Sequence, residues 1–447
     1  MKLNPIITSL LEIDMYKLSM GQCIYHQFSG YKTTWTFHCR NKDVFFTPEM
    51  VNEIREQLQA YCALRFTEEE LQYIDSIRWI KGSYVDFLRL WQPRYEDFTI
   101  STDAPCGLAI EARGSWLCSS MYEIPILAII NEVYFRMQYD YDALLRSFEQ
   151  KLDEKIGWLI SGKYHIGNFS EFGLRRRLSA EAQELAVKKL VEANSRFHSA
   201  NGLWSKCVGT SNVYLAKKYG ILPVGTQAHE FTMCVGQGNH RHNAAYSNWF
   251  ALDAWVKEYG ILNGTALTDT ITTDCFLKDF NLTFSTLFSG VRHDSGDPYR
   301  WADKMIAHYE KLDIDPKTKT LLFSDSLNFE NADALFNAYK GRAQVAFGIG
   351  IFILLKETPY LCLLPAPSFP QVIQGQYTSI FAILDRRTQK RKRIAVITKC
   401  GVTPQIQPCV CFFKCSLTNK PFGNVTGHTE EPIPFCGINC TILTLCS

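Results

Sequence analysis

The chain lacks an excess of charge of either sign. Its 447 residues include 47 lysines and arginines and 45 aspartates and glutamates, which leaves a formal net charge of +2. A protein that binds nucleic acid through bulk charge needs a strongly basic surface. We therefore expect no nucleic-acid partner, and any charged substrate must be recognised by local groups.

The chain also lacks a long uncharged apolar run. No window reaches the roughly 18 residues needed to cross a bilayer, so we expect no membrane span and no membrane partner. Residues 1–20 include Glu12, Asp14 and Lys17 and lack the basic start and apolar core of a signal peptide. We expect a cytoplasmic protein. The basic run at residues 386–393 is compatible with a nuclear presence, but such runs are more typical of a solvated surface.

Paired C-x-x-C spacings are absent, although the chain has 16 cysteines. Half of them are spread irregularly over residues 1–350, as expected for reduced and mostly buried thiols, and half fall in residues 351–447. A zinc site could be imagined from Cys409, Cys411, Cys415, Cys436 and Cys440. Zinc-binding cysteines usually come in close pairs, so this site is disfavoured.

The chain is instead rich in apolar residues, at 46%, and in aromatic residues, at 13%. This composition is typical of a folded protein, and the length allows two or three domains. Residues 1–140 indicate a mixed α/β domain, with an alternating strand at 34–40, a helix at 48–61 and an apolar helix at 122–130. Residues 351–447 form a separate, atypical cysteine-rich tail.

Residues 141–350 repeat one pattern, in which a short apolar run ends in a polar loop and a helical pattern follows. The last four loops are about 25–30 residues apart, which is the length of one β/α unit. The pattern predicts a parallel barrel or a closely related α/β fold, with its active face formed by the loops that follow the strands. These loops are Phe172–Arg175, Gly209–Asn212, Gly225–Glu230, Thr268–Thr270, Arg292–Asp297, Ser324–Ser326 and Gly348–Gly350.

The segment after Arg292 shows the pattern well. Asp297 is a good N-cap and Pro298 a good first helical residue. We expect the buried face of the helix that follows to contain Trp301, Met305, Tyr309 and Leu312.

Two of the loops carry groups that suit phosphate chemistry on a sugar. His229 can attack a phosphoryl group as a neutral imidazole, with Glu230 or another carboxylate holding its tautomer. Arg292 and Arg175 can each form forked, charge-assisted bonds to a phosphate or a carboxylate. The alternatives are a structural histidine and two surface ion pairs. A Schiff-base lyase or isomerase would use similar phosphate loops, but none of these loops carries a lysine.

Carboxylates stand at several strand ends. Asp269 and Asp325 suit a Mg²⁺–pyrophosphate complex or a cationic sugar transition state. Asp294, Asp297 or Asp325 is a candidate for binding Mg²⁺, and Asp294 and Asp297 are also candidates for ribose hydroxyls, although Asp297 could serve only as a helix cap.

Small residues mark the loops after the last two strands. The segments around Ser324 and Gly348–Gly350 could direct backbone N–H groups at an anion. Phe172 could stack on a flat ring, or it could be a buried aromatic residue beside Gly173.

In order along residues 1–350, these segments resemble the nicotinate phosphoribosyltransferase family. The matching segments are Asp14–Lys17, Glu171–Arg177, Val208–Asn212, Gly225–Glu230, Ala266–Thr270, Gly290–Pro298, Leu322–Asp325 and Phe347–Gly350. The resemblance implies an irregular β/α barrel of the type II phosphoribosyltransferase kind, packed on an N-terminal α/β domain. It also implies a cytosolic homodimer that joins nicotinate to 5-phosphoribosyl-1-pyrophosphate in NAD salvage, with ATP as co-substrate and Mg²⁺ or Mn²⁺ as cofactor.

The resemblance further implies roles for single residues. His229 matches a histidine that ATP phosphorylates. Thr226 and Arg292 match nicotinate contacts, Phe172 matches the aromatic residue that stacks on the ring, and Tyr16 matches a tyrosine that reaches nicotinate from the partner subunit. The positions that match the surroundings of the ribose and phosphates are Arg175, Asp294, Ser324 and Gly348–Gly350.

The sequence departs from the family after Gly350. The family continues with a threonine and further strands, whereas this chain has Ile351 and no expected motif. Our hypothesis is that residues 351–447 derive from an altered reading frame, a retained intron or alternative splicing, which transcript sequencing across the codon for Gly350 would test. One alternative within the same class is a nicotinamide phosphoribosyltransferase. The divergent tail adds a second alternative, a catalytically impaired relative.

Overall fold

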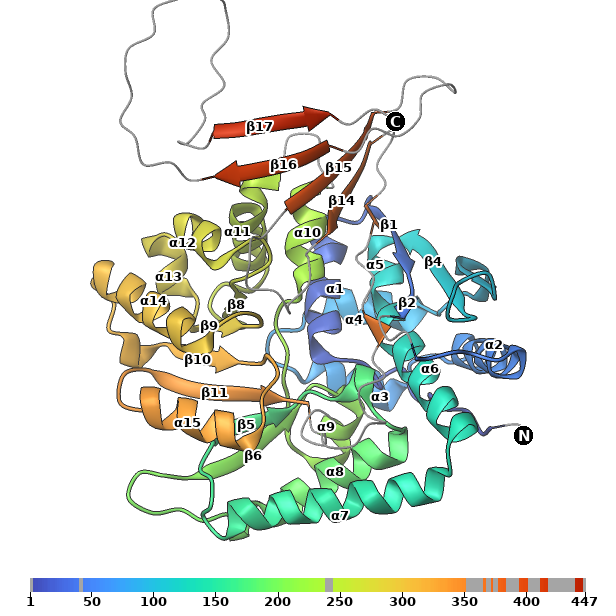
Figure 1. Cartoon of the computed structure of the whole chain (residues 1–447), viewed down its shortest axis with the longest axis horizontal. Coiled ribbons are helices and arrows are strands. Elements are labelled where there is room, and N and C mark those ends of the chain that lie inside the picture. The colour runs from blue at the N-terminus through green and yellow to red at the C-terminus, as the bar shows by residue number, and fades with distance from the viewer. Residues whose placement is uncertain are drawn as a thin grey trace, which may run out of the picture. The chain divides into compact units, whose positions relative to one another are not determined.

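The computed structural model of the chain, drawn in Figure 1, describes residues 3–39, 43–237 and 244–350. Within residues 351–447 it describes only the strands β12 (Pro365–Ala366), β13 (Gln371–Val372), β14 (Tyr377–Ala382), β15 (Ile394–Cys400), β16 (Cys411–Ser416) and β17 (Asn439–Thr444). The chain divides into two compact units, Met1–Pro370 and Gln371–Ser447. The basic run, Cys409 and Cys436 lie outside the described residues, and the predicted boundaries at 140 and 350 stay predictions.

A seven-stranded parallel sheet forms the centre of the larger unit, in the order β7-β6-β5-β11-β10-β9-β8. The strands are β5 (Gly167–Glu171), β6 (Ser205–Thr210), β7 (Leu222–Pro223), β8 (Thr265–Leu267), β9 (Gly290–His293), β10 (Thr320–Phe323) and β11 (Gln344–Ile349). Because every pairing is parallel, the carboxyl ends of all seven strands lie on one edge of the sheet.

The strand order is that of a barrel opened along one seam. The last strand, β11, pairs with the first, β5, through neighbours such as Ile349 and Glu171. Among the strands that the structure describes, β7 and β8 are not paired with each other. β7 has only two residues, and Pro223 has no backbone N–H to donate, as is typical of a strand at a sheet edge. The predicted barrel is therefore present as a curled half-barrel.

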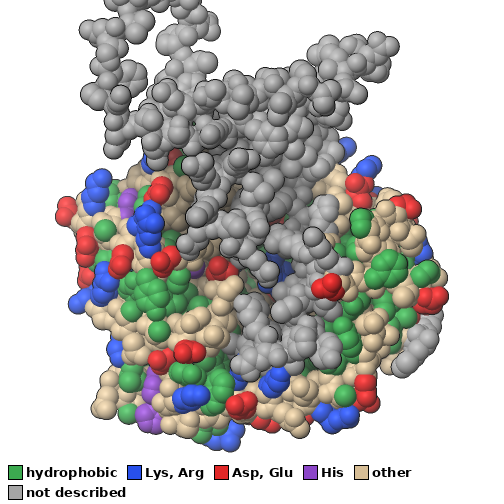
Figure 2. Space-filling model, viewed as in Figure 1, with side chains coloured by type: hydrophobic (Ala, Val, Ile, Leu, Met, Phe, Trp, Pro, Cys, Tyr) green, Lys and Arg blue, Asp and Glu red, His purple; other side chains and the backbone are tan. Residues whose placement is uncertain are grey.

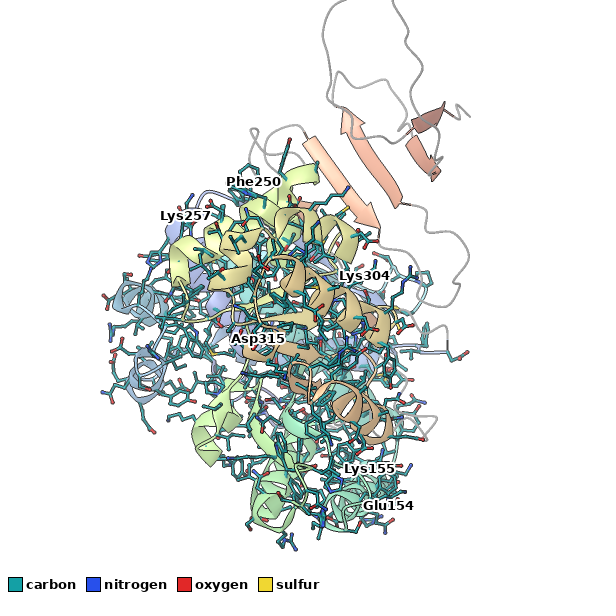
Figure 3. The ribbon with its side chains drawn as sticks, turned by 90° about the vertical axis from the view of Figure 1, so that its left-hand side faces the viewer. Glu154, Lys155, Phe250, Lys257, Lys304 and Asp315 are labelled. Atoms are coloured by element: carbon teal, nitrogen blue, oxygen red, sulfur yellow. The ribbon has the colours of Figure 1, made fainter. Side chains whose placement is uncertain are left out.

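Helices connect the strands and cover the sheet. Figure 1 shows α12 to α15 gathered beside β8 to β11, and Figure 3 marks the outer helices with Lys257 on α11 and Lys304 on α14. The connecting helices are α8 (Ala180–Ala193), α9 (Val213–Tyr219), α10 (His229–Gln237), α11 (Ser247–Tyr259), α12 (Thr273–Asp279), α13 (Leu282–Leu287), α14 (Pro298–Lys311) and α15 (Phe329–Tyr339).

Helix α14 confirms the local prediction. The Asp297 carboxylate accepts hydrogen bonds from the first free backbone N–H groups, those of Tyr299 and Arg300, at 2.9 and 3.2 Å. Trp301, Met305 and Tyr309 are buried, whereas Leu312 follows the end of the helix and is partly exposed.

The N-terminal part combines helices with antiparallel strands, in which β4 pairs with both β1 and β3. Its strands are β1 (Lys32–Thr36), β2 (His38–Cys39), β3 (Phe98–Ser101) and β4 (Ala109–Ser115). Its helices are α1 (Met15–Gln27), α2 (Pro48–Cys62), α3 (Glu68–Asp75), α4 (Gly82–Leu90), α5 (Trp116–Ser119), α6 (Glu123–Gln138) and α7 (Tyr141–Ile160). The helices predicted at 48–61 and 122–130 correspond to α2 and to the start of α6.

The expected alternation of the first strand is wrong. Thr33, Thr34 and Trp35 are all buried, so both faces of β1 are covered. On one face the hydroxyl of Thr33 lies 2.5 Å from that of Ser119 and the Trp35 ring lies 4.6 Å from the ammonium group of Lys17, and on the other face Thr34 is buried. A strand covered on both sides shows no polar face in its sequence.

The N-terminal segment runs along the carboxyl edge of the half-barrel. The backbone N–H of Met15 donates to the carbonyl of Ser211, at 2.7 Å, just beyond β6. A Cβ atom on Gly225 would lie 2.5 Å from the backbone nitrogen of Tyr16, so only glycine allows this approach. Tyr16, expected to come from a partner subunit, therefore lies beside the loops of its own chain.

The surface of the described part carries mixed charge. Figure 2 shows acidic and basic side chains interspersed over the face that is drawn, in keeping with the near-balance of charge in the sequence. Over the same residues, none of the helices is long and apolar enough to cross a membrane.

Candidate active site

Three loops of the half-barrel meet at His229, the first residue of α10. Its Nε2 atom lies 3.0 Å from Oδ2 of Asp294, which follows β9. Its Nδ1 atom lies 3.2 Å from the hydroxyl of Thr270, which follows β8. Because both imidazole nitrogens have partners from neighbouring loops, the ring is held in one orientation.

Asp294 stands at the centre of the charged groups. Its Oδ1 atom accepts from Arg292 Nη2 at 3.1 Å and from the Ser324 hydroxyl at 3.0 Å. Burial alone would raise the pKa of Asp294, but Arg292 and His229 outweigh it and hold the pKa well below its ordinary value. Asp294 is therefore ionised at neutral pH and can accept a hydrogen bond from an N–H at Nε2 of His229.

Arg292 is held by three protein contacts. Its Nε atom donates to the Ser324 hydroxyl at 2.8 Å, Nη1 donates to the carbonyl of Gln227 at 3.1 Å, and Nη2 pairs with Asp294. A guanidinium has five N–H groups, so one N–H on each Nη atom is not used by these contacts. These two N–H groups form a fork that suits a carboxylate or a phosphate.

The remaining strand-end carboxylates differ in their surroundings. The Ser295 hydroxyl donates to Oδ2 of Asp269, whereas Oδ1 of Asp269 is buried without a hydrogen-bond partner in the described part of the chain. Asp325 accepts from the hydroxyl of Ser326 at 3.0 Å. Asp297 is exposed and caps α14, which is the structural alternative considered for it.

The loop after β5 lies against β11. Phe172 donates its backbone N–H to the carbonyl of Ile349 at 2.9 Å. A Cβ atom on Gly348 would lie 2.4 Å from the Phe172 ring, so the glycine allows the ring to lie flat on the strand. The partly exposed ring and the end of β11 at Gly350 therefore share one part of the carboxyl edge.

Two further polar atoms at this edge are buried without partners among the described residues. They are the hydroxyl of Tyr16 and the amide nitrogen of Gln227. Gln227 lies between Thr226 and His229, and its side-chain oxygen accepts from the Leu267 backbone at 3.5 Å. Buried polar atoms without partners are uncommon and costly, so these two atoms are available to a polar ligand.

Glu230 does not hold the tautomer of His229, although the sequence suggested either Glu230 or another carboxylate for this role. It points away and accepts from Lys17 at 2.6 Å and from the indole N–H of Trp116 at 2.7 Å, while Asp294 takes the expected role. Residues of a helix one position apart face different directions, which explains the difference.

Sequence reasoning missed Thr270, Lys17 and Glu123. Thr270 lay in a loop already selected, and its position after β8 was the available signal. Lys17 lies in a segment that matched the family but was given no role. Nothing in the apolar run from Glu123 onward indicated that its carboxylate pairs with Lys17 at 2.7 Å and with Arg175 at 3.5 Å.

The side chains in the described residues contain no cluster of three or more His, Cys, Asp or Glu that could hold a metal by itself.

These features define an α/β-barrel enzyme with its site at the carboxyl edge of a parallel sheet. The family model "Nicotinate phosphoribosyltransferase (NAPRTase) family" matches residues 168–364, and the model of the corresponding N-terminal domain matches residues 11–131. The nicotinate phosphoribosyltransferase of Acinetobacter baylyi is 43% identical over 358 residues, which is 78% of this chain and 85% of that protein. That of Neisseria gonorrhoeae is 42% identical over 357 residues, with the same coverage.

Solved structures agree with the sequence relatives. The nicotinate phosphoribosyltransferase of Vibrio cholerae has a TM-score of 0.71 at 31% identity, covering 84% of this chain and 90% of that one. The enzyme of Porphyromonas gingivalis has a TM-score of 0.70 at 30% identity, with coverage of 83% and 90%. The chain belongs to the nicotinate phosphoribosyltransferase family.

Proposed function

We propose that the chain is a nicotinate phosphoribosyltransferase of NAD salvage, in which ATP phosphorylates His229. The observation that carries the proposal is the imidazole of His229 held between Asp294 and Thr270, in a chain of this family. Phosphoryl acceptance needs a neutral imidazole with one free lone pair and a fixed tautomer. Asp294 supplies the second condition when it accepts a hydrogen bond from the N–H at Nε2.

The phosphoryl step then follows from the tautomer. Nδ1 of His229 carries the lone pair and forms a bond to the γ-phosphorus of ATP, while the bond to the β–γ bridging oxygen breaks and ADP leaves. Asp294 stabilises the positive charge that develops on the imidazole. His229 begins α10, so the positive end of the helix dipole lies beside the new negative charge. The Thr270 hydroxyl turns from Nδ1 to a phosphoryl oxygen.

In the glycosyl step, the ring nitrogen of nicotinate forms a bond to C1 of the ribose, and the bond from C1 to the pyrophosphate oxygen breaks. The two unused N–H groups of Arg292 bind the nicotinate carboxylate beside Thr226. Phe172 and Tyr16 contact the nicotinate ring. This orientation places the ring nitrogen toward the sugar.

The sugar side of the site is formed by Arg175, Ser324, Asp325 and the Gly348–Gly350 segment, which surround the ribose and its phosphates. Arg175 supplies positive charge, and the short loop after β11 offers backbone N–H groups. These roles explain why anion-binding groups come from loops after three neighbouring strands, β5, β10 and β11.

The residues present also fit Mg²⁺, or Mn²⁺ in its place. Oδ1 of Asp269 is a buried carboxylate oxygen without a partner in the described residues, and Asp294 and Asp325 lie in the loops after the next two strands, β9 and β10. Hard divalent cations prefer such oxygen ligands. A bound cation would neutralise charge on the leaving pyrophosphate.

A purified-protein assay with nicotinate, phosphoribosyl pyrophosphate and Mg²⁺, with and without ATP, tests the proposal. Nicotinate mononucleotide should form, faster with ATP, and ³²P from γ-labelled ATP should enter the protein in an acid-labile, alkali-stable form that His229→Ala abolishes. Turnover of nicotinamide but not nicotinate would refute the substrate assignment. Absence of label in the wild type would refute the ATP-coupled step.

We also propose that the protein works as a cytoplasmic homodimer, as the family resemblance implies. Light scattering of the purified protein should give twice the 51.2 kDa of one chain. A mass of one chain in an active preparation would refute the dimer.

A further inference from the structure

We propose that a buried chain of four alternating charges positions His229 and Arg175 together, with Lys17 and Glu123 as positioning residues that touch no substrate. The chain runs from Glu230 through Lys17 and Glu123 to Arg175, with links of 2.6, 2.7 and 3.5 Å. The inference rests on the proposed function, because it assigns one end of this series of charges to the phosphoryl side of the site and the other end to the sugar-phosphate side.

Lys17 is the fixed centre of this charge chain. Its side chain is fully buried, and its ammonium group lies 2.6 Å from Glu230, 2.7 Å from Glu123 and 3.4 Å from the hydroxyl of Ser120. Three N–H donors therefore have three partners, and the Trp35 ring lies 4.6 Å from the nitrogen on another side. Burial alone would lower the pKa of Lys17, but the two glutamates raise it and keep the group charged.

Both ends of the charge chain reach the site. Glu230 follows His229 at the start of α10, and its second oxygen accepts from the Trp116 indole at 2.7 Å. Glu123 is the first residue of α6 and pairs with Arg175 in the loop after β5. Arg175 is also attracted by Asp14 and, more weakly, by Asp294, the partner of His229. A movement of the charged side chain at one end therefore changes the electrostatic field at the other end.

The alternating signs make the charge chain intolerant of losing one member. Two glutamates balance one lysine and one arginine, so removal of any single charge leaves another uncompensated in a buried site. If Glu123 becomes neutral, Arg175 loses its partner at 3.5 Å and is left to the attraction of Asp14 and Asp294. Asp294 would then hold the tautomer of His229 less firmly. If Glu123 contributed only to stability, its loss would not affect the His229 side and the Arg175 side of the site together.

Glu123→Gln in the full chain tests the inference, with Glu258→Gln as the matched control. Glu258 is similarly buried and lies 2.9 Å from Lys81, but it is on α11, away from the chain of four charges. For Glu123→Gln, the rate of ³²P transfer from ATP to His229 should fall at least tenfold. The KM for phosphoribosyl pyrophosphate should rise at least fivefold and that for nicotinate should not change. Glu258→Gln should leave all three values within twofold of the wild type.

A second variant, Lys17→Met combined with Glu230→Gln, removes one positive and one negative charge and decides the question if Glu123→Gln does not fold. Its labelling should also be slow, because Glu230, next to His229, loses its contact with Lys17, although Glu123 still holds Arg175. Wild-type values in either folded variant would overturn the inference, and so would an equal fall in every rate at unchanged KM, which indicates only fewer folded molecules. An unlabelled wild type would instead overturn the ATP-coupled function and with it this inference.

Discussion

Replacing Asp294 by asparagine should slow phosphorylation of His229 without unfolding the protein. The amide keeps one oxygen for Arg292 and Ser324, so the contacts at 3.1 and 3.0 Å can remain. The other atom becomes an NH₂ group facing Nε2 of His229, where the carboxylate stood at 3.0 Å. Two N–H groups cannot face each other, so the imidazole proton moves to Nδ1 and removes the lone pair that attacks ATP.

The size of the effect follows from the lost charge. Asp294 is about one-sixth exposed, with 16% of its side chain accessible, so solvent reduces its interaction with the imidazole. A hydrogen bond to a charged group contributes about 1.5–3 kcal/mol. A loss of about 2–3 kcal/mol corresponds to a rate lower by roughly 30- to 150-fold, and the reversed tautomer adds to it.

Single-turnover labelling with γ-³²P-ATP measures this rate. The matched control is Asp303→Asn, the same change on the exposed surface of α14, where Asp303 pairs with Arg342 at 2.8 Å. The control should label at the wild-type rate, and both variants should keep the wild-type thermal midpoint within a few degrees. Labelling of folded Asp294→Asn within threefold of the wild type would show that Asp294 does not set the tautomer.

Three other changes give distinct outcomes. Gly348→Ala should displace the Phe172 ring, which lies 2.4 Å from the new Cβ, and raise the KM for nicotinate. This rise should be roughly tenfold at most. The control Gly341→Ala, whose new Cβ would have no atom within 4 Å, should leave the KM unchanged. Burial raises the pKa of Glu171 to about 7, so the folded state holds a proton that the unfolded state releases near pH 4.5. Unfolding free energy from urea titrations should therefore fall by about 3 kcal/mol between pH 4.5 and 7, and Glu171→Gln should remove this slope; an unchanged slope would refute it. Met305→Ala opens a cavity under the fully buried face of α14 and should cost about 2–5 kcal/mol in the same titrations; a cost below about 1 kcal/mol would contradict the packing.

The sequence predicted the features that depend on local physical chemistry. The cap at Asp297 and the apolar face that includes Met305 act within one helix, so their spacing alone indicates α14. The repeated β/α pattern likewise predicted the parallel sheet and the loops at its carboxyl edge. His229 and Asp294 were selected separately, and the parallel sheet brings them together from positions 65 residues apart.

Features that depend on distant pairing were not predictable in this way. The seam beside β7 depends on which strands fail to pair, and two residues ending in Pro223 carry too little pattern to show it. The contact between Lys17 and Glu230 joins positions 213 residues apart, and a lysine in an apolar context gives no sign of its partner. The half-buried strand predicted at β1 was wrong because residues distant in the sequence cover both of its faces.

The pairing of β11 with β5 determines where alternative splicing of the transcript would leave the sheet unchanged. Ile349 is in register with Glu171, so β11 ends at the active edge and not at the opposite end of the sheet. All seven strands of the sheet precede that point, because Gly350 follows β11. A splice junction after this codon would leave the seven strands and the loops between them unchanged, and transcripts could differ downstream while they encode the same parallel sheet.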